Sequence, residues 1–397
     1  MAEGGGAIRH GLAEGGSLGL RRILGTAFLV TLVTTLPPFL AGSLASEVSS
    51  SLDSQPTFLG LAIGGFFFTA GFGSIVIGKT VEARGWRVSM QLASTLSGTS
   101  LLGVGLLGQT RFGFALCLAF GGLSMSVGNP GVNLALATEA PTQRQGLVFG
   151  VKHSAVPVAA FLSGLALPVF ALNFGWRAVF VGAGVMALSS ALLPAKIRER
   201  SPKSPRDDGA RSGELRLKPL VALACGALFA AIGASALSAF LVISLIDSGV
   251  SIAIAGILLS FASVGGLMMR LLAGWLVDRQ SGTGLGGVAG LLALGALGCL
   301  LLTASSLWVL TIGAFVTFAA GWGWNGLFNF AVVKSHPNAP GRATSLALVG
   351  TYWGAATGPV LFGLVADSMS FDVAWLVTAG VALVGSGVML VARSMVD

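Results

Sequence analysis

Two basic side chains stand inside long apolar stretches of this sequence. Lys152 lies in "GLVFGVKHSAVP" and Arg270 in "MMRLLAGWLVDR", each about two helical turns from the nearest polar boundary. A charge within an apolar membrane helix costs at least about 2.5–3.5 kcal/mol on insertion scales, so it marks a functional site by default. The quoted stretches contain one acid, Asp278, which lies eight residues after Arg270 at the polar boundary. A bound anion could complete the set, because the planar fork of Arg suits a carboxylate or a nitrate-like group.

Structural roles for the same residues stay open at this point. Lys152 could extend its ammonium to the aqueous boundary, which lies only about 10 Å away by helix rise. Arg270 could hold backbone carbonyls or the acidic residue that follows it. His153 could titrate near neutral pH and carry a proton, or act only as a hydrogen-bonding residue.

Two pairs of amides also lie in apolar stretches. Asn129 and Asn133 form one pair, and Asn325 and Asn329 form the other. Their i, i+4 spacing places each pair on one helical face. They could line a central cavity or join packed helices, as Asn commonly does in membranes. Pro130 adds a third option, a hinge, because proline removes one helical hydrogen bond.

Two aromatic residues accompany these amides. Trp322 precedes Asn325 by three residues, so it shares that helical face, and Tyr352 is the only tyrosine of the chain. Both are candidates to contact a substrate, with ordinary packing as the alternative.

The composition is that of a helical membrane protein. The 397 residues are 54% hydrophobic and only 10% charged, against about 25% charged residues in soluble proteins. The three cysteines lie in apolar runs without disulfide or metal-site spacing, so we expect no cofactor and no metal.

Apolar runs of about 20 residues predict transmembrane helices. We count twelve, which makes this an all-α polytopic protein. The predicted spans are 22–43, 58–78, 87–108, 112–137, 145–170, 176–193, 219–245, 251–277, 285–304, 307–331, 342–365 and 373–392.

The basic residues orient these spans. Most of the 23 lysines and arginines fall on the side of the N-terminus, which the positive-inside rule assigns to the cytoplasm. Both termini are then cytoplasmic, with a disordered tail over 1–20 and a linker over 194–218. The net charge of +8 follows from topology and from contact with anionic lipid, and it argues against a nucleic-acid partner.

The linker divides the chain into bundles over 21–193 and 219–397. A single shift of 196 residues aligns Asn129 with Asn325 and Asn133 with Asn329. An internal repeat of this kind is typical of membrane transporters.

The loops after the second and eighth spans read "GKTVEARGWR" over 78–87 and "GWLVDRQSG" over 274–282. Both resemble the cytoplasmic signature of the major facilitator superfamily, in which a Gly is followed by an acid and basic residues. The first copy departs from the pattern with Glu82 in place of Asp and with Ala83 at the usual basic position, and in the second Gly282 comes one place late. The residues of the two copies are Gly78, Glu82, Arg84, Gly274, Asp278 and Arg279.

The resemblance implies a gating role for these loops. Glu82 would contact the start of the eleventh span near Arg342, and Asp278 the start of the fifth near Gln145. A carboxylate at a helix N-terminus is favoured by the helix dipole. The alternative is that the loops serve only topology and folding.

The resemblance also implies two six-helix bundles that move about a central site, in a monomer that is not an enzyme. No phosphate loop of the Walker form is present, so an ion gradient would drive transport. Arg270 resembles by position the helix-eight arginine of anion-transporting branches. We therefore expect a transporter of a small organic or inorganic anion, working by proton symport or anion exchange in a bacterial cytoplasmic membrane.

Two other functions stay open. A proton-coupled exporter of hydrophobic compounds is suggested by the apolar interior and by "SAVPVAAFLSG" in the fifth span, a degraded form of the Gly-Pro motif of antiporters. A sensor or scaffold that transports nothing would not need buried cations.

Overall fold

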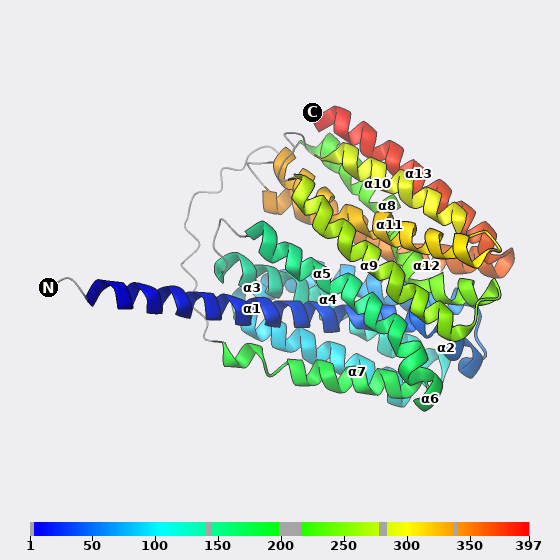
Figure 1. Cartoon of the computed structure of the whole chain (residues 1–397), viewed down its shortest axis with the longest axis horizontal. Coiled ribbons are helices and arrows are strands. Elements are labelled where there is room, and N and C mark those ends of the chain that lie inside the picture. Colours follow the sequence, from blue (N-terminus) through cyan, green and yellow to red (C-terminus); the bar gives the residue numbers. More distant parts are fainter. Residues whose placement is uncertain (1–3, 140–144, 198–215, 278–283, 337–339, 397) are drawn as a thin grey trace.

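A computed structural model describes the backbone of residues 4–139, 145–197, 216–277, 284–336 and 340–396, and these ranges contain only helices and their connections (Figure 1). The side chains of 4–19, 75–83, 145–147, 273–277 and 340–342, and of a few single residues, lie outside the description.

The first half of the chain contains α1 to α7 and two short helical turns. Their bounds are α1 Gly4–Ser43, α2 Ala45–Leu52, α3 Pro56–Leu107, α4 Arg111–Glu139, α5 Gln145–Ala166, a π-helical turn Leu167–Ala171, α6 Leu172–Phe174, α7 Trp176–Ser190 and a 3-10 turn Pro194–Lys196. The second half contains six helices. They are α8 Leu217–Asp247, α9 Ile252–Val277, α10 Leu285–Leu301, α11 Leu307–Ser335, α12 Pro340–Ser368 and α13 Phe371–Val396.

The twelve predicted spans map onto these helices. α3 contains the second and third spans, which meet at Gly85, where φ is 81°. Such a positive φ suits glycine and turns the chain back. Ten stretches of the described chain are long and apolar enough to cross a membrane, while Trp176–Ser190 and Leu285–Leu301 are shorter apolar helices. The prediction of a twelve-span, all-α membrane protein is confirmed.

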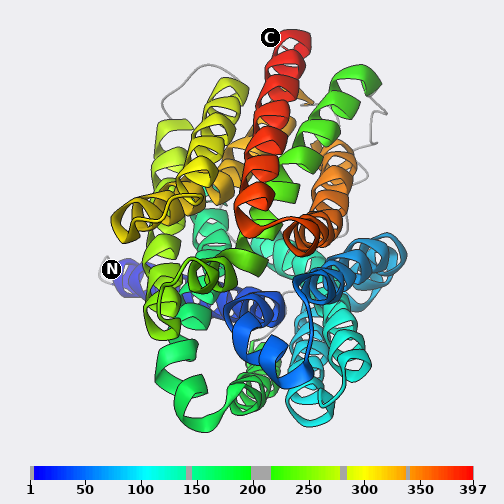
Figure 2. The ribbon, with the colours of Figure 1, turned by 90° about the vertical axis from the view of Figure 1, so that its right-hand side faces the viewer.

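Helices of the two halves form two groups that lie side by side (Figure 2). Across the boundary α3 packs on α12, α5 packs on α9, and α1 packs on α8. Under the predicted repeat the first part of α3 corresponds to α9 and α5 corresponds to α12, so the α3–α12 and α5–α9 pairs are equivalent to each other. The third pair joins α1 to α8, the corresponding first helices of the two halves. The domain limits at 21–193, 194–218 and 219–397 stay predictions, because residues 198–215 lie outside the description.

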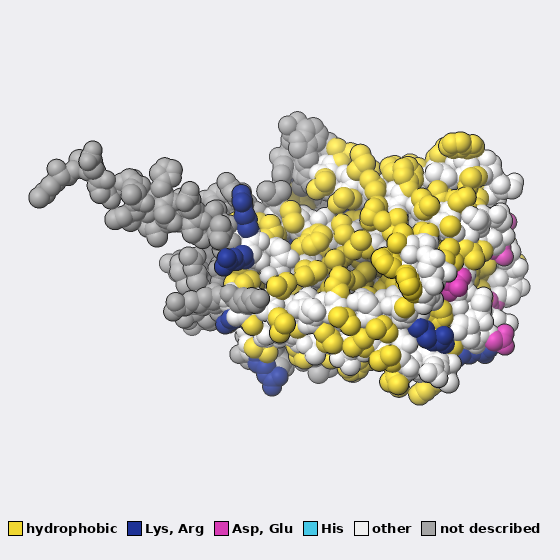
Figure 3. Space-filling view, turned by 60° about the horizontal axis from the view of Figure 1, so that its bottom comes forward, with side chains coloured by type: hydrophobic (Ala, Val, Ile, Leu, Met, Phe, Trp, Pro, Cys, Tyr) yellow, Lys and Arg dark blue, Asp and Glu magenta, His cyan; other side chains and the backbone are white. Residues whose placement is uncertain are grey.

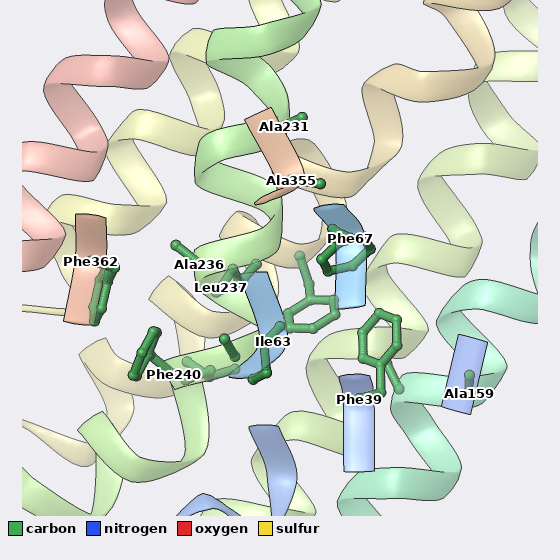
Figure 4. Packing of buried hydrophobic residues seen from close by; sticks show 14 of the residues in the cluster. Phe39, Ile63, Phe67, Ala159, Ala231, Ala236, Leu237, Phe240, Ala355 and Phe362 are labelled. Carbon is green, nitrogen blue, oxygen red and sulfur yellow. The ribbon is translucent and has the colours of Figure 1, made fainter. Parts of the chain in front are cut away.

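The contact between the halves is apolar and tightly packed. Phe39 and Phe67 from the first half approach Leu237 and Ala355 from the second (Figure 4). A Cβ added at Gly60 of α3 would overlap the carbonyl oxygen of Pro359 on α12. Small residues let membrane helices approach closely, which replaces the hydrophobic drive that lipid removes.

The surface carries a broad apolar band between two polar ends (Figure 3). We call the end that carries the N-terminus the tail end, and the opposite end, where α3 begins and α12 ends, the distal end (Figure 1). Asp53 and Arg111 lie near Thr57 at the distal end, and Asp367 contacts Thr57 there. Phe112 and Phe174 are 76% and 72% exposed, as expected of side chains that face lipid or its interface.

Helix α1 begins at Gly4, so helical backbone occupies much of the segment where the sequence predicts a disordered tail over 1–20. The side chains of residues 4–19 lie outside the description, and no contact of the tail is assigned.

Candidate functional site

Lys152 is held by the amide pair of the neighbouring helix. It projects from α5, is only 3% exposed, and donates from Nζ to Oδ1 of Asn129 at 3.2 Å and of Asn133 at 3.1 Å. Both amides belong to α4, where their i, i+4 spacing presents both oxygens to one side. The ammonium is therefore solvated by neutral protein oxygens and does not extend to the boundary.

Arg270 lies on α9 and reaches two other helices. Its Nε and Nη2 both donate to the carbonyl oxygen of Trp322 on α11, each at 3.3 Å. Its Nη1 donates to the carbonyl oxygen of His153 on α5. Arg270 thus connects the second half of the chain to the first, directly beside Lys152.

The ring of Trp322 lies near the guanidinium of Arg270 and packs on a second aromatic ring. The central carbon of the guanidinium lies 5.9 Å from the ring centroid of Trp322, and that ring lies 5.7 Å from Phe39 of α1. Trp322 Nε1 is buried and has no hydrogen-bond partner among the described residues. Sequence reasoning singled out Trp322 but missed Phe39, since one phenylalanine among 24 carries no signal of its own.

The two cations have no anionic partner in the part of the chain that the structure describes. A salt bridge between Arg111 and Asp53, at 3.6 Å, lies at the distal end, away from both. Arg270 bonds to the backbone of the residue that follows Lys152, so the two positive charges repel each other. The side chain of Glu139, the nearest acid in sequence to Asn133, lies outside the description. Buried charges are normally paired, so two unpaired cations side by side are an exception that calls for a ligand.

The structure brings together Lys152, Arg270, Asn129, Asn133 and Trp322, together with the backbone of His153. The His153 ring is half-buried at the same place. Three other predicted residues make no described contact with this cluster. Asn325 and Asn329 are half-buried on α11, without a hydrogen bond among the described residues, and Tyr352 of α12 faces Gly71 of α3.

The predicted gating loops fall almost wholly outside the description. Arg84 is exposed on α3, whereas the side chains of Gly78, Glu82, Gly274, Asp278 and Arg279 are not described.

Sequence reasoning missed one contact at the distal end. The backbone N–H of Thr57, at the start of α3, donates to Oδ2 of Asp367 on α12 at 2.7 Å.

The family model of the Major Facilitator Superfamily matches residues 23–347 and, in a second match, residues 223–395. The chain belongs to the major facilitator superfamily. A search of curated proteins finds no match.

Solved structures show the same fold. A bacterial homolog of the human lysosomal transporter Spinster, in an inward-facing and occupied conformation, aligns at 17% identity over 94% of this chain and 97% of its own, with a TM-score of 0.72. The D-xylose–proton symporter aligns at 16% identity over 93% and 96%, with a TM-score of 0.75. A variant of the nucleoside transporter NupG aligns at 12% identity over 93% and 99%, with a TM-score of 0.68.

This major facilitator protein is therefore an integral, multi-pass secondary transporter of a small molecule, and it is not an enzyme. The likenesses to solved structures establish the fold, and the substrate has to be argued from the site of this chain.

Proposed function

We propose that the transporter carries a small anion, held between Lys152 and Arg270. The observation that carries the proposal is the pair of buried cations without a carboxylate partner among the described residues. An anion between them would relieve their mutual repulsion and gain charge-assisted hydrogen bonds in a site of low dielectric constant. Trp322 Nε1, which has no partner of its own, offers a further donor.

The chemistry of the donors narrows the class of anion. Lys152 is tied to two amide oxygens and offers a third N–H, while Arg270 offers a planar fork. Carboxylates and nitrate-like ions present planar oxygens that such a fork can hold in pairs. Phe39 and Trp322 make one flank apolar, which favours an anion that sheds its hydration shell.

Coupling to a proton or exchange for a second anion would supply the energy. The D-xylose–proton symporter shares the fold and is proton-coupled, and we extend that coupling to this chain as a proposal. His153 is the titratable side chain beside the two cations and is our candidate proton carrier.

We also propose that the protein is a monomer in a bacterial cytoplasmic membrane and that both termini are cytoplasmic. The loops around Glu82 and Asp278 would act as the gates.

The test is uptake into proteoliposomes under an imposed proton gradient. Nitrate, small mono- and dicarboxylates and a cationic dye are compared for the wild type, Lys152→Ala and Arg270→Ala. We expect at least one anion to enter in the wild type and its uptake to fall at least about tenfold in both variants, the loss typical of one charge-assisted contact.

The second candidate is proton-coupled export of hydrophobic compounds. It is favoured by the apolar wall around Trp322 and by Pro157 in the fifth span. Dye movement that is insensitive to both substitutions, with no anion uptake, would support this candidate and contradict ours. Correctly inserted protein that moves none of the compounds would point to a sensor or scaffold.

A further inference from the structure

Proline leaves one carbonyl oxygen of α5 without its helical partner. In an α-helix the N–H of residue i+4 donates to the carbonyl of residue i. Pro157 lies inside α5 and has no N–H, so the carbonyl of His153 receives no such bond. An unpaired backbone carbonyl inside a membrane protein is costly and has to find another donor.

The donor comes from the opposite half of the molecule. Nη1 of Arg270, on α9, donates to this carbonyl oxygen. A similar gap in α1 is filled differently. Pro37 frees the carbonyl of Val33, and the hydroxyl of Ser97 on α3 donates to it at 2.6 Å. That bond stays within the first half, so movement between the halves leaves it intact.

We propose that Pro157, the His153 carbonyl and Arg270 form a tether between the two halves, and that the transported anion releases it by competing for the guanidinium. The competition rests on the function proposed above, whereas the tether itself does not. Pro157 acts in this account as a positioning residue, because it makes the His153 carbonyl available and touches no substrate.

The tether explains how an occupied site could change the balance between conformations. A guanidinium has five N–H donors, and three of its nitrogens already contact carbonyl oxygens of Trp322 and His153. An anion attracts a guanidinium more strongly than a neutral carbonyl does. When Arg270 turns to the anion, α5 and α9 lose this bond but keep the one from Ser260 Oγ of α9 to the carbonyl oxygen of Phe161 on α5, at 2.9 Å. The halves then separate more readily at the depth of His153. A ligand shifts a conformational balance only through such a difference in contacts.

The experiment measures the separation of the halves at the tail end. Nitroxide labels are placed on cysteines at Thr138 of α4 and Val333 of α11, both exposed, in a chain whose three native cysteines are replaced. Pulsed electron spin resonance gives the distance distribution of the full-length protein in lipid nanodiscs. Pro157→Ala restores an N–H that competes for the His153 carbonyl, and alanine favours a helix, so the variant is expected to fold.

Without added anion, Pro157→Ala should change the ratio of the short and long distance populations about tenfold toward the long one, on the order of one lost charge-assisted bond. Pro168→Ala is the matched control, because it restores an N–H in the fifth span but leaves the His153 carbonyl unchanged. Arg270→Gln should produce a shift of similar size. The double variant Pro157→Ala with Arg270→Gln should add little to either, because both act on one bond.

Unchanged distributions in Pro157→Ala, or fully additive shifts in the double variant, would overturn the tether. Nitrate and oxalate are then added in turn to the wild type. A shift toward the long distance that is absent in Arg270→Gln supports the competition. If Pro157→Ala shifts the distances but neither anion that the transporter takes up does so, the tether stands and the competition is wrong. If neither anion is taken up at all, the proposed function is what fails.

Discussion

At the residue scale, the unusual feature is that Lys152 is solvated by amides and not by a carboxylate. Asn129 and Asn133 offer oxygen dipoles that favour the ammonium, but they leave its full charge in place. A carboxylate at the same position would cancel that charge. The cluster therefore holds a cation in position while keeping it able to attract a mobile anion.

A single isosteric change tests this point. Asn129→Asp places a carboxylate about where the amide now accepts from Lys152 Nζ, so the protein supplies its own counter-ion. We expect anion uptake to fall at least about tenfold, the loss typical of one charge-assisted contact, while expression and thermal stability stay close to wild type. The measurement is initial uptake rate at several substrate concentrations, with Asn325→Asp as the matched control. Normal uptake by Asn129→Asp would show that the charge of Lys152 is not used.

The residue types predicted which side chains form this site, but not which of these side chains contact each other. Lys152 and Arg270 could be found because charge is rare in apolar spans, and Asn129 and Asn133 because their spacing defines one face. That this face meets Lys152 depends on how α4 and α5 pack, and sequence periodicity does not determine which helices are neighbours. The bond between Arg270 and the His153 carbonyl had one usable signal, a proline four residues after His153, which points to a freed carbonyl.

At the element scale, α3 and α12 form the close contact between the halves toward the distal end. A Cβ at Gly60 would overlap the Pro359 carbonyl oxygen, and a Cβ at Gly363 would come within 2.7 Å of the carbonyl oxygen of Pro56. The two helices can approach this closely only because these positions have no side chain.

Gly60→Ala should therefore destabilise the conformation in which the distal ends touch, by about 1–3 kcal/mol, the usual cost of overpacking. The conformation with the distal ends apart loses nothing, so its population should rise. Distances between spin labels at Ser50 of α2 and Met369, after α12, would report the change. Gly150→Ala is the control, because nothing lies within 4 Å of a Cβ at Gly150. Equal distances in the wild type and Gly60→Ala would contradict this account of the contact.

Asp367 adds a polar bond to the same pair of helices. Its carboxylate accepts from the Thr57 N–H at the start of α3, where a helix leaves donors unpaired. Removing such a cap costs about 0.5–2 kcal/mol, and a helix dipole favours a negative charge there. Asp367→Ala should shift the same label pair toward longer distances, and Asp367→Asn, which can still accept a hydrogen bond, should shift it less. A larger effect of Asn than of Ala would rule out capping as the cause.

The elements themselves were largely predictable from the sequence. Spans bounded by charge, proline and glycine matched the helices, because lipid forces each span to satisfy its own backbone bonds. The start of α1 at Gly4 was not predicted, since glycine-rich polar sequence has low helix propensity. The contact of Asp367 with Thr57 could not be foreseen, because it joins residues 310 positions apart in the sequence.

At the scale of the whole molecule, the two halves meet through three helix pairs, two of which the repeat relates to each other, with a charged cluster near one of them. Apolar and glycine contacts join α3 and α12, and Arg270 reaches across from α9 to α5. In alternating access, contacts between the halves on one side of the substrate site form while those on the other side break. The repeat was visible in the sequence through the paired asparagines, and among the described contacts the first pair bonds to Lys152.

Counterflow of a small anion in proteoliposomes tests the central claim most directly, because it requires no knowledge of the coupling ion. Vesicles loaded with an unlabelled anion are diluted into a trace of the labelled one, for the wild type and for Lys152→Met, which keeps an unbranched apolar side chain but removes the charge. We predict transient accumulation of label in the wild type and none in Lys152→Met. Equal accumulation in both, or accumulation only of a neutral or cationic compound, would contradict the claim that these buried cations bind the transported substrate.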